Sequence, residues 1–172
     1  MLFTKKATLE RVYVVLFSVV GILLLAQNVS WAATISCDTP GICKGTNEDD
    51  VINDGNDGQI IDELDGDDVI NSGGGNDDVC GGPGNDRIHL GGGDDRAWGD
   101  GLICKGQSMS AGADRINGGP GNDILAHGLA WDTDSDGFKD ILDCGPSDDI
   151  ALLNITIDHD EATNCEHINP YP

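Results

Sequence analysis

The sequence predicts an all-β solenoid of short parallel strands, and two observations carry this prediction. A nine-residue unit recurs six times without a break from Gly45 to Trp98, and most copies open with a glycine-rich half. The eighth residue of the unit is apolar in every copy. A fixed period of this kind indicates a repeat architecture in which each unit buries its apolar face against its neighbours.

The repeat continues beyond this unbroken tract. Two more units follow an insertion at 99–108, and another two follow a second insertion at 127–134. The ten units span 45–53, 54–62, 63–71, 72–80, 81–89, 90–98, 109–117, 118–126, 135–143 and 144–152. A glycine-rich turn found once would be an ordinary loop, but its recurrence in register with an apolar position makes the signal specific.

Each position of the consensus Gly-Gly-x-Gly-x-Asp-x-apolar-x has a physical role. Glycine at the first, second and fourth positions allows the positive φ angles of a tight loop. The sixth position is Asp in nine units and Gln59 in the other, and a carboxylate there supplies the hard oxygen that calcium binds. The eighth position follows on a short strand and is expected to face the interior. These residues are Ile52, Ile61, Ile70, Val79, Ile88, Ala97, Ile116, Leu125, Leu142 and Ala151.

This nonapeptide resembles the RTX, or haemolysin-type, calcium-binding repeat. The resemblance implies a right-handed parallel β-roll with two units per turn, in which calcium lies between the loop of one unit and the loop two units later. The best sites are then expected between loops 63–68 and 81–86 and between loops 72–77 and 90–95. The first turn departs from the pattern, because Glu48 and Asp57 replace the fourth glycine and Gln59 replaces the carboxylate. Calcium occupancy of that turn is left open.

The expected calcium ligands come from the sixth-position carboxylates and from the loop glycines, and we expect several ions. In the repeats they are Asp50, Gly66, Asp68, Gly75, Asp77, Gly82, Gly84, Asp86, Gly91, Gly93, Asp95, Gly112, Asp114, Gly119, Gly121, Asp123 and Asp149. The interior is thin, with about one apolar side chain per nine residues, so stacking alone has little to hold the chain together. We therefore expect the roll to fold when it binds calcium.

A second acidic pattern lies in the segment 132–143. It places acids at positions 1, 3, 5, 9 and 12 and glycine at position 6, the spacing of an EF-hand loop, although the last residue is Asp where such loops carry Glu. These acids are Asp132, Asp134, Asp136, Asp140 and Asp143. We favour an extra calcium loop over a simple acidic turn, although Asp140 also fits the nonapeptide phase.

The N-terminus and the charge predict an extracellular protein. Three basic residues precede an apolar run from Val12 to Ala26, and a small-residue site ends at Ala32, which predicts a signal peptide over 1–32. An uncleaved membrane anchor is the alternative. Residues 33–172 carry 30 acidic and 6 basic side chains, a net charge of −24, which excludes nucleic acid as a partner.

The six cysteines all follow the predicted cleavage site, as expected of an oxidising compartment. No Cys-x-x-Cys pair is present, which argues against zinc, and the sequence cannot choose among the 15 possible connectivities. Nearest-neighbour pairing would join Cys37 to Cys43, Cys80 to Cys104 and Cys144 to Cys165. The domain boundaries we expect are an N-terminal cap at 33–44, the roll at 45–152 and a C-terminal cap at 153–172. Leu152–Ile157 would add the last strand of the roll.

We predict no enzyme. Neither His-Glu-x-x-His nor Gly-x-Ser-x-Gly occurs, and too few residues lie outside the repeats for a catalytic domain. His159, with the acids beside it (Asp158, Asp160 and Glu161), is interpreted as part of a solvated acidic turn. The chain is expected to be a structural or adhesive calcium-binding protein, secreted or on the cell surface, with a glycan or protein partner. The alternative is a secreted module that binds or modifies polysaccharide through Trp98 or Trp131.

Overall fold

Two parallel β-sheets, wound from alternate strands, make up the protein in a computed structural model that describes residues 32–37, 41–100, 112–127, 137–153 and 159–170. Every pairing of strands is parallel. No helix occurs in the described part of the chain, so none there is long and apolar enough to cross a membrane. The predicted all-β class and parallel β-roll are confirmed.

The first sheet contains the odd-numbered strands, and the second sheet contains the even-numbered strands. In spatial order, the first sheet is β1 (Thr34–Cys37), β3 (Val51–Asp54), β5 (Val69–Asn71), β7 (Arg87–His89), β9 (Arg115–Asn117), β11 (Ile141–Asp143) and β13 (Glu161–Thr163). The second sheet is β2 (Ile42–Lys44), β4 (Ile60–Asp62), β6 (Asp78–Cys80), β8 (Arg96–Trp98), β10 (Ile124–Ala126), β12 (Ile150–Leu153) and β14 (His167–Pro170). One turn of the roll therefore uses two nonapeptides.

The core is a pair of apolar columns, one from each sheet. Eighth-position residues pair in register along each sheet, so that Ile70 lies between Ile52 and Ile88 in the first sheet. All ten of these side chains are at most 2% exposed. The strands are only three or four residues long because one inward side chain per strand fills the narrow interior. Both insertions leave the stack unbroken: β7 pairs with β9 and β8 with β10 across the first, and β9 pairs with β11 and β10 with β12 across the second.

Strands extend the roll at both ends beyond the ten units. β1 and β2 form a first turn within residues 34–44, and β13 and β14 form a last one. The last strand is therefore His167–Pro170 and not Leu152–Ile157. Ala162 and Ile168 continue the two columns in register, which explains why these segments are strands although they depart from the nonapeptide consensus.

The predicted disulfides Cys37–Cys43 and Cys144–Cys165 are confirmed, with Cα atoms 5.8 and 5.2 Å apart. The first lies within the first turn of the roll, and the second joins the last turn to the one before it. Cys80 is also disulfide-bonded, and its predicted partner Cys104 lies outside the described residues. So does the predicted signal peptide, apart from Ala32.

Candidate calcium-binding edges

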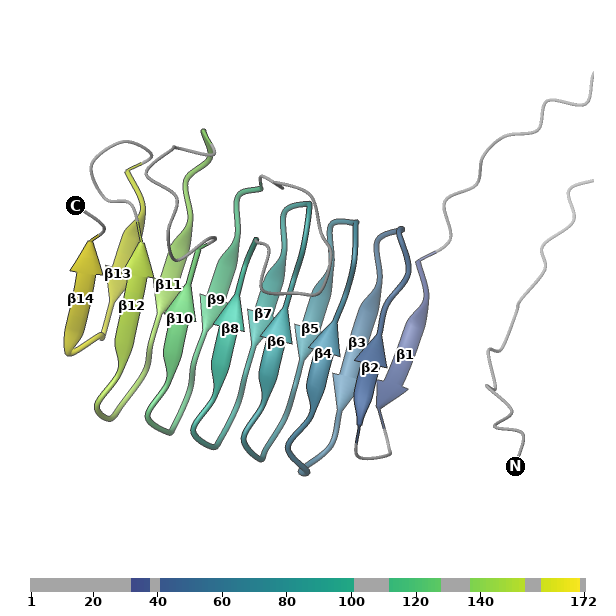
Figure 1. Ribbon diagram of the computed structural model, residues 1–172, viewed down its shortest axis with the longest axis horizontal. Coiled ribbons are helices and arrows are strands. Elements are labelled where there is room, and N and C mark those ends of the chain that lie inside the picture. Colours follow the sequence, from purple (N-terminus) through teal and green to yellow (C-terminus); the bar gives the residue numbers. More distant parts are fainter. Residues whose placement is uncertain (1–31, 38–40, 101–111, 128–136, 154–158, 171–172) are drawn as a thin grey trace, which may run out of the picture.

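The loops stack along two long edges of the roll (Figure 1). We define the first edge as the loops that lead into odd-numbered strands, and the second edge as the loops that lead into even-numbered strands. The sixth-position residues of the first edge are Asp50, Asp68, Asp86, Asp114 and Asp140. Those of the second edge are Gln59, Asp77, Asp95, Asp123 and Asp149. All ten are at most 4% exposed, so the predicted ligands form two buried rows.

On the first edge, one oxygen of each carboxylate binds the preceding turn. Its Oδ1 atom accepts a hydrogen bond from the backbone N–H of the sixth residue one turn earlier. Asp68 accepts from Asp50 at 2.7 Å, Asp86 accepts from Asp68 at 2.9 Å, and Asp114 accepts from Asp86 at 2.9 Å. Asp140 continues the row, accepting from Asp114 at 2.8 Å.

The second edge repeats this pattern with a modified start. Asp95 accepts from the N–H of Asp77 at 2.8 Å, and Asp149 accepts from Asp123 at 2.8 Å. At the first turn, Gln59 Oε1 accepts a hydrogen bond from Gly41 N–H at 3.2 Å. The Gln59 amide therefore makes the same bond to the preceding turn that an aspartate makes in the other units. It lacks the second carboxylate oxygen. The sequence-based distinction between this turn and the others therefore has a structural counterpart.

The second oxygen of these carboxylates is the unusual feature of the site. It is buried and has no hydrogen-bond partner among the described residues at Asp68, Asp86, Asp95, Asp114, Asp123 and Asp149. A buried polar atom without a partner is costly, and a row of carboxylates is costlier still. Rows of oxygens that can only accept, stacked turn on turn, fit calcium, which takes six to eight oxygen ligands.

Burial raises the pKa values of these carboxyl groups. Desolvation raises the pKa of Asp86 to about 8 and that of Asp68 to about 7 on the first edge. On the second edge it raises the pKa values of Asp95 and Asp123 to about 6. Desolvation also raises the pKa of Asp114, with the charges of neighbouring carboxylates adding to it. The protein alone therefore stabilises the negative charge on both edges poorly, and less well on the first.

Close stacking of the loops explains the fourth-position glycines. Gly84 has a φ of 140°, and a Cβ added to it would overlap the carbonyl oxygen of Gly66 in the preceding turn. Gly93 relates to Gly75 in the same way on the second edge. Leu64 occupies a second position with a φ of 81°, a conformation that costs an L-residue roughly 1–2 kcal/mol.

A further ladder, which we did not predict, involves the fifth position of the unit. The Oδ1 atom of Asp67 accepts from Asn85 N–H at 2.9 Å, and Asn76 accepts from Asp94 N–H at 3.1 Å. These side chains bind the following turn, whereas sixth-position side chains bind the preceding one. The sequence signal was present, because seven of the ten fifth positions are Asp or Asn. Hydrogen bonds from Asn85 lower the pKa of the exposed Asp67, so this ladder stays charged.

Glu63 is a second residue that sequence reasoning missed. It stands at the first position of its unit, is fully buried, and both carboxylate oxygens lack a hydrogen-bond partner among the described residues. Desolvation, together with the smaller effect of the charges of Asp68 and Asp50, raises its pKa to about 8. Its carboxylate lies where a Cβ on Gly45 would overlap it. Glu63 therefore adds a potential ligand to the first edge, near the loops 45–50 and 63–68.

The C-terminal acids are arranged differently from our expectation. Asp160 does not belong to a solvated turn, because it is 6% exposed and accepts from the N–H of Asp140 at 3.1 Å. Glu166 takes the same role on the second edge, accepting from Asp149. Each precedes by two positions an apolar residue that pairs in register with a core column, Ala162 or the 43% exposed Ile168, and this is the spacing of the repeat. That spacing was the available signal.

The two described acids of the EF-hand-like segment lie in different parts of the roll. Asp140 is fully buried on the first edge, whereas Asp143 lies on the outer face of β11, where it accepts from Asn164 Nδ2 at 2.7 Å. The structure does not bring these two carboxylates together. Asp132, Asp134 and Asp136 lie outside the described residues.

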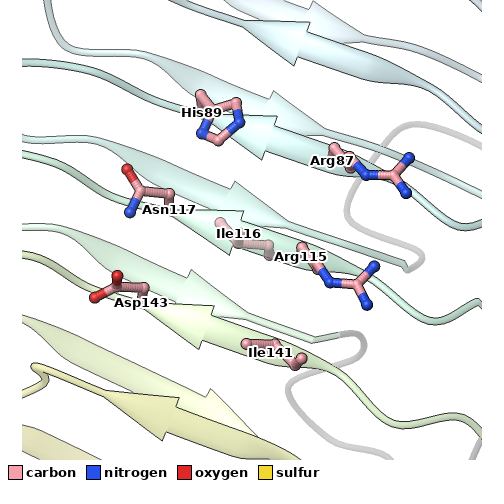
Figure 2. Close-up of a pocket in the computed structure, with 7 residues that line it drawn as sticks. All are labelled: Arg87, His89, Arg115, Ile116, Asn117, Ile141 and Asp143. Carbon is pink, nitrogen blue, oxygen red and sulfur yellow. The ribbon is translucent and has the colours of Figure 1, made fainter.

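The outer face of the first sheet has a shallow depression of about 200 Å³ (Figure 2). Arg87 and Arg115 lie side by side at one end of it, on neighbouring strands. Its other lining side chains include His89, Asn117, Ile141 and Asp143. Trp98 is half-buried on β8 in the other sheet, and Trp131 lies outside the described residues.

Comparison with known proteins agrees with this geometry. The model of the RTX calcium-binding nonapeptide repeat family matches the chain in four copies, over residues 64–88, 81–101 and 110–129. No curated protein and no solved structure matches the chain. The matched residues include both loop pairs in which we expected the best calcium sites, and the weaker first turn lies outside them.

Proposed function

We propose that this protein, whose residues 64–129 are RTX calcium-binding nonapeptide repeats, is secreted and folds when it meets calcium outside the cell. The observation that carries the proposal is the double row of buried, unpartnered carboxylate oxygens. Calcium between successive loops would satisfy these oxygens and remove their repulsion. The free energy of calcium binding would then stabilise the folded chain directly.

The proposed role is structural or adhesive, at or beyond the cell surface. Disulfides at both ends of the roll suit an oxidising compartment, and so does the apolar N-terminal segment. Extracellular calcium modules bind their ion at roughly 10⁻⁴–10⁻³ M. A roll of that affinity would be unfolded at cytosolic calcium levels and folded outside. The repeats supply a rigid scaffold, and catalysis is no part of the proposal.

The test is far-UV circular dichroism of the chain with intact disulfides, titrated with calcium from a chelated start. We expect a cooperative coil-to-β transition near millimolar calcium, with magnesium inactive. Asp86→Asn should shift the midpoint to higher calcium, because it removes a buried ligand. Asp78→Asn, which removes the same charge on an exposed face, should not. A β spectrum that is unchanged by calcium would refute the proposal.

Polysaccharide binding is a second candidate, favoured by the depression in Figure 2. Two arginines in register on a chain of net charge −22 offer a local site for an anionic sugar, and the amide of Asn117 can hydrogen-bond to hydroxyl groups. Binding to an acidic polysaccharide that is lost in Arg87→Ala with Arg115→Ala, while the calcium transition is kept, would support this candidate. If Trp98→Ala binds the polysaccharide as well as the unaltered chain does, the site is not built on Trp98.

A further inference from the structure

The two ends of the first edge differ in the side chain that occupies the first position of the loop. A Cβ added at Gly81 or Gly99 would meet the Oδ2 atom of Asp86 or Asp114, so first-position side chains on this edge project toward the second carboxylate oxygens. Near the N-terminal end that position holds Glu63. Near the C-terminal end it holds His127, directly after β10. The same place in the fold therefore presents a carboxylate at one end and an imidazole at the other.

His127 faces two carboxylates of successive turns. Its Nδ1 atom lies 3.6 Å from Asp140 Oδ2 and 4.0 Å from Asp160 Oδ2. Oδ1 of each aspartate accepts a backbone N–H in the sixth-position ladder, and Oδ2 of each lies toward the imidazole ring. All three side chains are at least nine-tenths buried, and one donor atom from each lies within 4.8 Å of the others.

The imidazole itself has no hydrogen bond that explains its burial. Nε2 is buried without a partner among the described residues, and Nδ1 is beyond hydrogen-bonding distance of both carboxylates. The backbone of His127 is fixed on both sides, since its N–H donates to Leu152 O at 3.2 Å and its carbonyl accepts from Asp100 N–H at 2.8 Å. A rigidly placed, buried and unbonded imidazole that points at two carboxylate oxygens is a donor set for a cation.

The chemistry of the donors selects the class of cation. Calcium takes oxygen ligands, whereas imidazole is a ligand of zinc and of other first-row transition metals. Two ligand atoms on a tetrahedral zinc ion, each about 2.1 Å from the metal, lie roughly 3.4 Å apart. The observed separations of 3.6 and 4.0 Å need only small adjustments to reach that value. Three protein ligands would leave a fourth position for water or another oxygen.

We propose that His127, Asp140 and Asp160 bind one transition-metal ion of the zinc class, distinct from the calcium ions between the all-oxygen loops. The roll would thus carry two kinds of metal. The inference goes beyond calcium-dependent folding and needs only that the last turns are formed.

The test uses the full chain with intact disulfides, held folded in excess calcium and titrated with Co²⁺ as a spectroscopic substitute for zinc. We expect visible d–d absorption that saturates at one Co²⁺ per chain and is abolished by one equivalent of Zn²⁺. His127→Glu reproduces the first-position residue of the other end, and it should weaken Co²⁺ binding at least 100-fold while keeping the calcium transition. His89→Gln, an exposed histidine on β7, is the matched control and should bind Co²⁺ as the unaltered chain does.

Two results would overturn the proposal. One is Co²⁺ absorption in His127→Glu equal to that of the unaltered chain. The other is displacement of Co²⁺ by an equal concentration of calcium, which would make this another calcium site. If His127→Glu does not fold, zinc X-ray absorption of the unaltered chain decides, because an imidazole must be seen in its coordination shell. Calcium-induced folding is measured separately by circular dichroism, so its failure is distinguishable.

Discussion

The two edges of the roll are built from the same repeat, but they differ in the ionisable side chains that they hold at the first position of the loop. On the second edge, Asp54 is the one ionisable side chain at the first position of the described units; Leu90 and Cys144 are fully buried there, and Ser72 Oγ donates to Leu90 O at 2.8 Å. On the first edge, the same position holds Glu63 and His127. The first edge therefore concentrates ionisable groups, whereas the second completes part of its packing without them.

From this difference we expect the first edge to depend more on bound cations than the second edge does. The pKa values of first-edge carboxyl groups rise to about 7 or 8 at Asp68, Asp86 and Glu63, compared with about 6 at Asp95 and Asp123. A larger upward shift means that the protein offers less compensation for the charge. Removal of calcium should therefore disrupt the first edge more than the second.

The largest effect is expected from alanine substitutions of the loop glycines, which should destabilise both edges in the same way. Gly84→Ala and Gly93→Ala each place a Cβ onto a backbone carbonyl of the preceding turn at a positive φ. We expect each to lower the free energy of unfolding in calcium by roughly 2–5 kcal/mol, the sum of backbone strain and overpacking. Urea unfolding followed by circular dichroism measures it. Gly55→Ala, where no atom lies within 4 Å of the added Cβ, is the control and should have little effect.

Asparagine substitutions should separate the edges. Asp86→Asn and Asp95→Asn both keep the Oδ1 acceptor for the preceding turn and remove one buried charge. In chelator, Asp86→Asn should stabilise the folded roll more than Asp95→Asn, by up to about 3 kcal/mol for two pKa units. The midpoint of folding induced by trimethylamine N-oxide reports this. In calcium both variants should lose stability, and equal stabilisation of the two in chelator would contradict the difference between the edges.

The pH dependence of folding should change sign with calcium. Carboxyl groups whose folded pKa is raised from about 4 to about 8 contribute stability that is present below pH 4 and lost as the pH rises toward 8. In chelator, less trimethylamine N-oxide should therefore be needed at pH 5 than at pH 8. In calcium, protons compete for the ligands, so acidification should lower the urea midpoint. The same direction in both conditions would be inconsistent with the carboxylates being calcium ligands.

The smallest effect is expected away from both edges. Arg96 and Asp78 form an ion pair of 3.3 Å on the outer face of the second sheet, and both side chains are well exposed. Arg96→Ala should change the free energy of unfolding by no more than about 0.5 kcal/mol, as exposed pairs usually do. A loss as large as that of Gly84→Ala would show that the outer faces carry stability that we have attributed to the edges.

The sequence predicted the fold because the period defines it. The register of the sixth and eighth positions predicted the buried columns, and the resemblance to the RTX repeat implied the parallel pairing of alternate units. Prediction was weaker at positions where the residue departs from the consensus of the repeat. Asp160 was assigned to a solvated turn, and Glu63 and His127 were given no role, because the burial of these residues depends on which edge of the roll they lie on and on which turn they meet. Around Asp160 and Glu166, all that remains of the repeat is an acidic residue two positions before an apolar one.

The two hydrogen-bond ladders have a mechanical consequence. Where both ladders are present, as between loops 63–68 and 81–86, fifth-position side chains bind the next turn and sixth-position side chains bind the one before, so the interface is held from both sides. A pulling force applied along the axis should then open the roll from an end, one turn at a time, as a series of nearly equal force peaks. The disulfide Cys144–Cys165 joins the last turn to the one before it and would resist opening at that end.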